Sequence, residues 1–147
     1  MHLTTVEICA GAGGQSLGLH LAGFEHVKAI ELDQSAAGTL AHNLKRLGSN
    51  SSEIVAVGDV ADPSVWNPAD YQGVSLLAGG VPCPPFSLAG NQTGSADERA
   101  LFACSDEPAG RLQPQAILLA NVRGLPLARV ASSRPPVRER LSGPGVL

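Results

Sequence analysis

A cysteine enclosed by prolines is the residue in this sequence best suited to covalent chemistry. Cys83 lies in the segment Gly-Gly-Val-Pro-Cys-Pro-Pro-Phe-Ser, residues 79–87. Because proline fixes the backbone φ angle, such a loop holds its cysteine in one orientation, and a thiolate held there is a soft nucleophile once its pKa is lowered. The alternative is a buried, inert thiol, the usual state of a lone cysteine. We interpret Cys83 as a nucleophile and Cys9 and Cys104 as packing residues.

A glycine-rich turn followed by an acid predicts a binding site for a nucleoside-containing cofactor. The turn contains Gly11, Gly13 and Gly14, and a backbone without Cβ atoms can approach a ligand and point amide groups at it. Glu31 lies twenty residues after Gly11, where an acid accepts hydrogen bonds from ribose hydroxyls. The dinucleotide fingerprint needs a third glycine where this sequence has Ser16, which disfavours the alternative of a nucleotide-dependent oxidoreductase.

A second acid, Asp59, follows another apolar run in the tripeptide Gly-Asp-Val. A carboxylate at this place is suited to accept a hydrogen bond from an adenine amino group. The alternative is an aspartate that caps a turn or a helix through its own backbone. Both interpretations stay open at the level of the sequence.

Short apolar strands that alternate with helical patterns must position these residues. We expect strands at 3–9, 27–31, 54–57, 74–79 and 116–122, and helices from near 15 to 23 and over 34–46. This alternation predicts an α/β domain with a parallel sheet and helices on both faces. In open parallel sheets, ligands bind beyond the carboxyl ends of the strands. The glycine turn, Glu31, Asp59, the cysteine loop and Asn121 all lie at or just after strand ends, so we expect them to converge there.

The composition is that of one globular domain. The 147 residues are 44% hydrophobic, 16% charged and 3% aromatic, which excludes a disordered or collagen-like chain. No run of about eighteen apolar residues and no basic segment followed by an apolar run occurs, so we expect a cytoplasmic protein. Three widely spaced cysteines and four histidines show no ligand spacing, so we expect reduced thiols and no metal site.

The charge and the proline content divide the chain unevenly. Residues 1–122 carry five basic and twelve acidic side chains, a net charge of −7, whereas residues 123–147 carry five arginines and one glutamate, a net charge of +4. All eleven prolines follow position 62. We therefore expect a domain over 1–125 and a poorly ordered tail rich in arginine and proline over 126–147. The arginines suit either a solvated helix face, which we favour, or a contact with phosphate.

Taken in order, these motifs resemble the catalytic domain of C5-cytosine DNA methyltransferases. The matching blocks are 8–24, 29–44, 58–60, 76–90, 97–102 and 118–125, which together cover about positions 6–125. The Pro-Cys block is the most specific of them. The resemblance implies a Rossmann-like S-adenosylmethionine-dependent methyltransferase domain with a mostly parallel sheet, incomplete at its C-terminus, of the kind found in restriction-modification systems.

The resemblance also implies S-adenosylmethionine as the cofactor. In the family pattern Glu31 contacts the ribose, Leu32 packs near the adenine, and Asp59 and Val60 lie at the adenine edge. The full set of cofactor-binding residues that the resemblance implies is Ala10, Gly11, Gly13, Gly14, Glu31, Leu32, Asp59, Val60 and Gly80.

The substrate implied by the resemblance is double-stranded DNA with a cytosine rotated out of the helix, because the ring cannot be reached inside the stack. Cys83 attacks C6 of that cytosine, C5 takes the methyl group, and loss of the C5 proton releases the enzyme. The loop from Ser87 to Arg99 closes over the DNA. Pro82, Ser87, Arg99 and Asn121 are the substrate-binding residues implied.

Three positions depart from the family pattern. Where the family has Glu-Asn-Val, this chain has Ala120, Asn121 and Val122. The missing glutamate contacts the cytosine and assists protonation of N3, and general-acid assistance contributes on the order of 10² to 10⁴ in rate. Cys9 stands where an aromatic residue often flanks the cofactor, and Pro84 replaces a frequent glutamine.

The sequence ends at Leu147, before the arginine-containing block, the target-recognition region and the C-terminal motifs of the family. We therefore expect a weakly active or inactive chain with its fifth strand as an exposed edge. The alternative is a non-catalytic remnant, or half of a split methyltransferase that binds the cofactor or a complementing C-terminal polypeptide.

Overall fold

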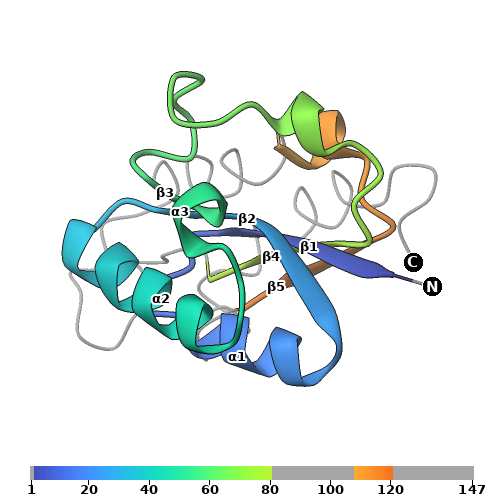
Figure 1. The fold of residues 1–147 in the computed structure, drawn as a ribbon. Coiled ribbons are helices and arrows are strands. Elements are labelled where there is room, and N and C mark those ends of the chain that lie inside the picture. The colour runs from blue at the N-terminus through green and yellow to red at the C-terminus, as the bar shows by residue number, and fades with distance from the viewer. Residues whose placement is uncertain (1, 81–107, 121–147) are drawn as a thin grey trace, which may run out of the picture.

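A parallel five-stranded sheet forms the centre of the molecule in the computed structural model, which describes residues 2–80 and 108–120 (Figure 1). The strand order is β3-β2-β1-β4-β5, and each neighbouring pair is parallel. The strands are β1 (Leu3–Ile8), β2 (Phe24–Glu31), β3 (Val55–Val57), β4 (Leu76–Gly79) and β5 (Ala116–Leu119). The predicted parallel α/β architecture is confirmed.

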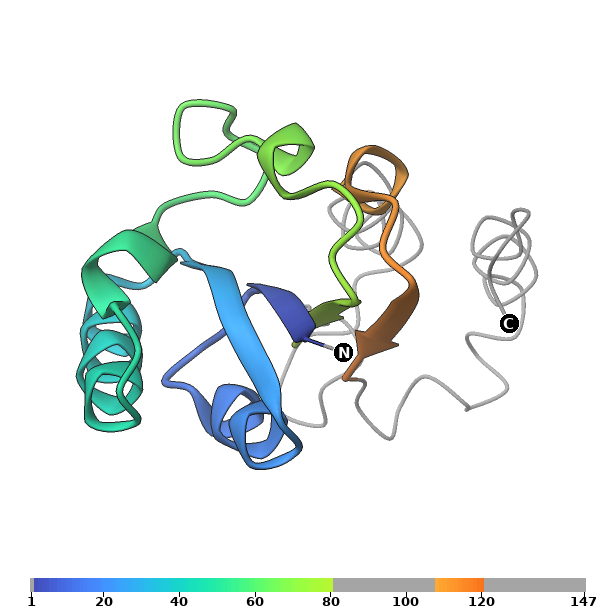
Figure 2. The ribbon, with the colours of Figure 1, turned by 45° about the vertical axis from the view of Figure 1, so that its right-hand side comes forward.

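Two α-helices connect the first three strands and cover one face of the sheet (Figures 1 and 2). They are α1 (Gly14–Leu21) and α2 (Gln34–Arg46). The predicted limits of α2 are confirmed at both ends. It begins after Asp33, whose Oδ1 accepts a hydrogen bond from the N–H of Ala36 at 2.7 Å. An aspartate at this position satisfies one of the N–H groups that a helix start leaves without a partner.

Tertiary pairing moves several predicted boundaries. We expected the second strand to begin at residue 27, but β2 begins at Phe24 because residues 24–26 pair with the start of β1. The strand expected from residue 54 is preceded by a short helix, α3 (Ser51–Ile54), which takes in Ile54. The fourth strand begins at Leu76 rather than at residue 74. The mixed polar and apolar residues at 24–26 hide their pairing from a pattern of hydrophobicity, whereas the apolar Ile54 and Val74 fit a strand pattern and lie outside β3 and β4.

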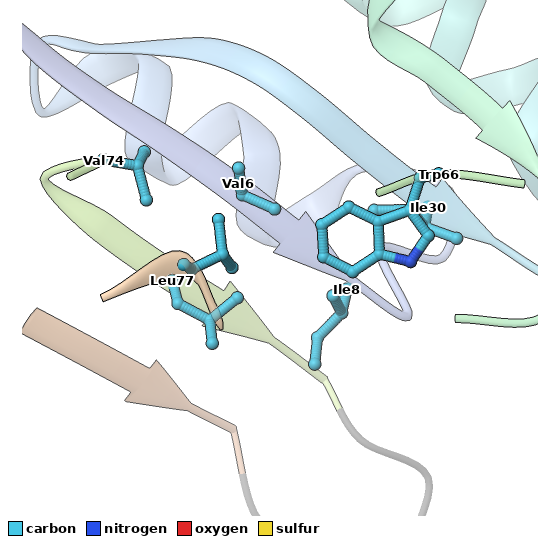
Figure 3. Close-up of a cluster of buried hydrophobic side chains, with 7 residues drawn as sticks. Val6, Ile8, Ile30, Trp66, Val74 and Leu77 are labelled. Carbon is cyan, nitrogen blue, oxygen red and sulfur yellow. The ribbon is translucent and has the colours of Figure 1, made fainter. Parts of the chain in front are cut away.

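Among the described residues, the opposite face of the sheet is covered by a largely irregular connection and by short helices. Residues 58–75 run across it with one 3₁₀ turn, η1 (Pro68–Tyr71), and a helical turn at 108–112 lies beside them (Figures 1 and 2). The prediction of helices on both faces is therefore confirmed: α1 and α2 cover one face, and in the part of the chain that the structure describes η1 and the helical turn at 108–112 lie on the other. The core of this face contains Val6, Ile8, Ile30, Trp66, Val74, Leu77 and Leu112 (Figure 3).

Within residues 2–80 and 108–120, no helix is long and apolar enough to cross a membrane.

Candidate functional site

The carboxyl ends of the strands bring together the predicted site residues that lie in residues 2–80. Backbone hydrogen bonds link these ends in sheet order, from Gly58 N–H to the carbonyl of Glu31 at 2.9 Å and from Ala10 N–H to the carbonyl of Ile30 at 3.1 Å. On the other side of β1, Gly79 pairs with Ile8. The parallel topology therefore places the glycine turn and Glu31 at the same edge of the sheet as the ends of β3 and β4, as predicted.

The glycine turn between β1 and α1 needs its glycines for two separate reasons. Gly11 and Gly13 have φ values of 58° and 97°, a backbone region that side chains with a Cβ rarely adopt. A Cβ at Gly13 would lie 2.9 Å from Cδ1 of Leu40 in α2, whereas one at Gly11 or Gly14 would meet no other atom within 4 Å. The turn therefore packs tightly against α2 at Gly13 and borders open space at Gly11 and Gly14.

Glu31 is fastened to the glycine turn through both of its carboxylate oxygens. Oε2 accepts from the N–H of Gly11 at 2.7 Å, and Oε1 accepts from the N–H of Asp33 at 2.8 Å. A carboxylate has about four acceptor positions, so these two bonds leave room for hydroxyl donors. The next residue, Leu32, is 70% exposed. Glu31 thus orders the turn, a role the sequence did not predict.

Ala10 and Gly80 complete this end of the central strands. Ala10 is buried in the small apolar cluster beneath α2. Gly80 follows β4 and is exposed, and a Cβ built on it would lie 3.5 Å from the carbonyl oxygen of Cys9. The ends of β1 and β4 are therefore neighbours, which places Gly80 beside the glycine turn.

Asp59 and Val60 follow β3 in a tightly folded segment. Gly58 has φ 149°, and a Cβ there would lie 2.5 Å from Cγ2 of Val65, so the chain folds back onto this glycine. Oδ1 of the exposed Asp59 accepts from the N–H of Ala61 at 2.9 Å. The turn-capping interpretation of Asp59 is therefore confirmed, and the remaining acceptor positions of its carboxylate leave the adenine interpretation open.

A buried polar cluster of Glu7, Ser16 and His26 lies beneath the glycine turn, and the sequence did not predict it. All three are at most 2% exposed. The hydroxyl of Ser16 donates to Oε2 of Glu7 at 2.5 Å, and Nε2 of His26 lies 3.5 Å from the same oxygen. Among the described residues, Oε1 of Glu7 and both ring nitrogens of His26 have no hydrogen-bond partner. Because Ser16 is in the first turn of α1, this bond ties the start of the helix to β1.

Ala120 lies at the end of β5, next to the end of β4. Its N–H donates to the carbonyl of Gly79 at 2.8 Å, and its side chain is exposed. The alanine that replaces the family's glutamate is therefore at the strand-end edge, close to where the chain leaves β4 toward Cys83.

The remaining predicted residues lie outside the described residues. They are Pro82, Cys83, Ser87, Arg99 and Asn121, and the tail at 126–147 is outside as well. In residues 2–80 and 108–120, no group of histidine, cysteine, aspartate and glutamate side chains could hold a metal ion.

Comparison with known sequences gives a consistent set of relatives. The chain matches the family described as C-5 cytosine-specific DNA methylase over residues 3–132. It is 57% identical to the type II methyltransferase M.NaeI of Lentzea aerocolonigenes over 143 residues, which are 97% of this chain and 33% of that protein. It is 47% identical to the type II methyltransferase M.NgoMIV of Neisseria gonorrhoeae over 147 residues, the whole of this chain and 44% of that protein. The chain thus spans less than half the length of these relatives.

Solved structures share the fold. A protein described as a DNA modification methyltransferase encoded within a prophage (E. coli) superposes with a TM-score of 0.71 at 27% identity, covering 96% of this chain and 38% of that one. The S. pombe Dnmt2 methyltransferase superposes with a TM-score of 0.61 at 20% identity, covering 95% of this chain and 40% of that one. In both cases the chain covers less than half of a longer protein.

Proposed function

The chain belongs to the C-5 cytosine-specific DNA methylase family, and from this membership we propose that it forms the cofactor-binding, nucleophile-bearing part of a type II DNA methyltransferase that modifies cytosine at C5. The observation that carries the proposal is the hydrogen bond from Gly11 to Glu31. It joins the glycine turn to the ribose acid at the edge where α/β sheets bind ligands. An oxidoreductase is disfavoured because Ser16, bonded to Glu7, stands where the dinucleotide fingerprint needs its third glycine.

The residues at this edge fit S-adenosylmethionine, which supplies a methyl group on a sulfonium. Open space beside Gly11 and Gly14 admits a ligand against the backbone. Glu31 has free acceptor positions for ribose hydroxyls, and the exposed Leu32 offers an apolar surface for adenine. Ala10, Gly13 and Gly80 shape the turn and its neighbourhood, with Asp59 and Val60 at the adenine edge.

The reaction that we propose uses Cys83 as the nucleophile on a cytosine turned out of double-stranded DNA. Its sulfur forms a bond to C6, so that C5 becomes nucleophilic and takes the methyl group. Loss of the C5 proton then breaks the bond between sulfur and C6 and restores the aromatic ring. Pro82, Ser87, Arg99 and Asn121 are proposed to hold the cytosine and its DNA strand.

A second candidate function is that of one half of a split enzyme. The chain covers only 33% and 44% of its two relatives above. Leu118 on β5, the last strand in the sheet order, is 47% exposed. A separate C-terminal polypeptide that carries the DNA-reading region would complete both the sheet and the site. In this case the present chain binds cofactor without turnover until that polypeptide is added.

Cofactor binding is tested first, by titration calorimetry with S-adenosylmethionine. We expect the wild-type chain to bind and Glu31→Ala to bind at least tenfold more weakly, because the ribose acceptor and the anchor of Gly11 are both lost. Glu53→Ala, which removes an exposed acid in α3, is the matched control and should bind as the wild type does. Absence of binding to the wild-type chain would contradict the proposal.

Covalent chemistry is tested with DNA that contains 5-fluorocytosine, which traps the enzyme because C5 carries no removable proton. We expect little adduct from the wild-type chain, more from Ala120→Glu, and none when Cys83→Ala is added to that variant. If Ala120→Glu is inactive alone but forms adduct after the C-terminal region of a relative is supplied in trans, the split-enzyme function is favoured. An adduct that persists in the Cys83→Ala variant would exclude Cys83 as the nucleophile.

A further inference from the structure

Trp66 forms a hydrogen bond to the segment that carries Asp59 and Val60, the residues proposed to lie at the adenine edge. Its indole Nε1–H donates to the carbonyl of Val60 at 2.8 Å, and the residue is 5% exposed. Asp59 and Val60 lie beyond the last paired residue of β3, Val57. Their backbone is therefore held by local contacts rather than by the sheet, and the bond from Trp66 joins two points six residues apart.

Several short-range bonds support the same loop. The N–H of Asp62 donates to the carbonyl of Asp59, and the N–H of Val65 donates to the carbonyl of Asp62, both at 3.0 Å. Such bonds shape successive turns but connect them only to each other. The indole bond differs because its donor belongs to a side chain buried in the core.

The ring of Trp66 packs against the carboxyl-end half of the central strands. Figure 3 shows it beside Ile8 and Ile30, and all three belong to the same buried cluster. Tyr71 of η1 packs against the same cluster, with its ring centroid 6.4 Å from that of Trp66. Trp66 therefore packs on the strand ends with its ring and binds Val60 with its N–H, so that this rigid side chain fixes Val60 relative to the strands.

We propose that Trp66 is a positioning residue for adenine recognition, acting through the Val60 carbonyl to hold Asp59 and Val60 at the edge of the cofactor site. This inference rests on the proposed function, since it requires that adenine binds at the end of β3. It goes beyond that function because it assigns the selectivity of the site to a core residue that does not itself touch the ligand. A tryptophan that only fills space would hold the sheet together without affecting which base is bound.

The two roles are separated by Trp66→Phe, which keeps an aromatic ring in the core and removes the N–H donor. Calorimetry compares binding of S-adenosylhomocysteine with that of its inosine analogue, in which the 6-amino group is replaced by a carbonyl oxygen. We expect the wild-type chain to prefer the adenosine compound and Trp66→Phe to bind it about five- to tenfold more weakly. We also expect the preference between the two compounds to shrink by at least threefold.

Tyr71→Phe is the matched control, because it alters the other aromatic ring of the pair and leaves the bond to Val60 intact. It should bind both compounds as the wild-type chain does. An unchanged preference in Trp66→Phe, or an equal loss for both compounds, would show a merely structural role and overturn the inference. No binding to the wild-type chain would instead overturn the proposed function and this inference with it.

A measurement on the wild-type chain tests the same inference without depending on whether the variant folds. Trp66 is the single tryptophan of the sequence, so its fluorescence reports on this loop alone. Titration with S-adenosylhomocysteine should change the emission with the same affinity that calorimetry gives. Calorimetric binding without any change in emission would count against a link between Trp66 and the adenine edge.

Discussion

The two faces of the sheet hold the two parts of the proposed cofactor site in different ways. Where α1 meets the sheet, the buried Glu7, Ser16 and His26 form a polar cluster that anchors the start of the helix after the glycine turn. On the opposite face, an apolar cluster around Trp66 supports the segment of Asp59 and Val60, with one indole hydrogen bond at its margin. The same parallel sheet thus positions one part of the site by polar pairing and the other by packing.

This difference predicts different responses to substitution. In an apolar cluster, the loss of stability follows the volume removed, because the neighbours relax only partly into the cavity. In a buried polar cluster, it follows the number of groups left without hydrogen bonds, even when little volume changes. Four substitutions test this comparison, beginning with the one expected to have the largest effect.

Leu77→Ala tests the apolar face. Leu77 is fully buried in the cluster that contains Trp66, and truncation of a buried leucine lowers the free energy of unfolding by about 2–5 kcal/mol. Urea denaturation followed by circular dichroism measures the change. Leu118→Ala at the half-exposed edge strand is the control and should lose much less. A loss at Leu77 below that at Leu118 would show that this face is loosely packed.

Glu7→Ala tests the polar cluster on the helix face. It leaves the buried Ser16 hydroxyl without its acceptor, and an unpaired buried polar group costs about 1–3 kcal/mol. Glu7→Gln keeps a side-chain oxygen for Ser16 and should be less destabilised. Urea denaturation of both variants is the measurement. If the two lose equal stability, the contact with His26, rather than the bond to Ser16, would account for the role of Glu7.

Gly13→Ala tests the turn that the polar cluster anchors. The left-handed backbone at φ 97° costs a residue with a Cβ about 1–2 kcal/mol, and that Cβ would also contact Leu40 at 2.9 Å. We expect a loss of this size in thermal unfolding together with weaker cofactor binding. Gly18→Ala, in the middle of α1 and with open space around its Cβ position, should instead raise stability by about 0.5–1 kcal/mol. Equal effects at the two glycines would contradict a special role for Gly13.

Asp62→Asn should have the smallest effect and a dependence on pH. The backbone N–H of Ser64 donates to Oδ1 of Asp62 at 2.8 Å and holds the pKa of this carboxyl below its ordinary value of 3.8. A lowered pKa in the folded state stabilises the fold above the ordinary value, and this contribution is lost as the pH falls through the lowered pKa. The wild-type chain should therefore exceed the variant slightly in thermal stability at pH 7. The difference should shrink as the pH falls below 3.8 and vanish below the lowered pKa, and a difference that grew there would reverse the assigned direction.

Much of the fold and part of the site were predictable from residue patterns. The limits of α2 follow from its helical periodicity and from Asp33 as its cap, both of which are local properties. The convergence of the glycine turn and Glu31 follows from a general rule, since the carboxyl ends of parallel strands lie on one edge. Sequence patterns could not show the bond from Gly11 to Glu31, because it depends on how two strand ends approach each other.

The buried polar cluster of Glu7, Ser16 and His26 could not be predicted from the sequence. Glu7 lies in an apolar strand pattern and Ser16 in a helix start, and neither type of residue indicates burial by itself. Their pairing requires that β1 is central in the sheet and that α1 packs over it. The roles proposed for Cys83, Asn121 and the other substrate residues remain predictions from the motifs.

The sequence alone specifies the local order of strand, glycine turn and helix. Hydrophobic periodicity, glycines and helix caps encode this order, and each of them acts over only a few neighbouring residues. The family membership follows from the same motifs. The tertiary structure determines the order of the strands, the burial of Glu7 and the packing of Trp66 in the core, from which its indole N–H bonds to Val60. These features come from packing and desolvation, which depend on what covers each residue rather than on what precedes or follows it.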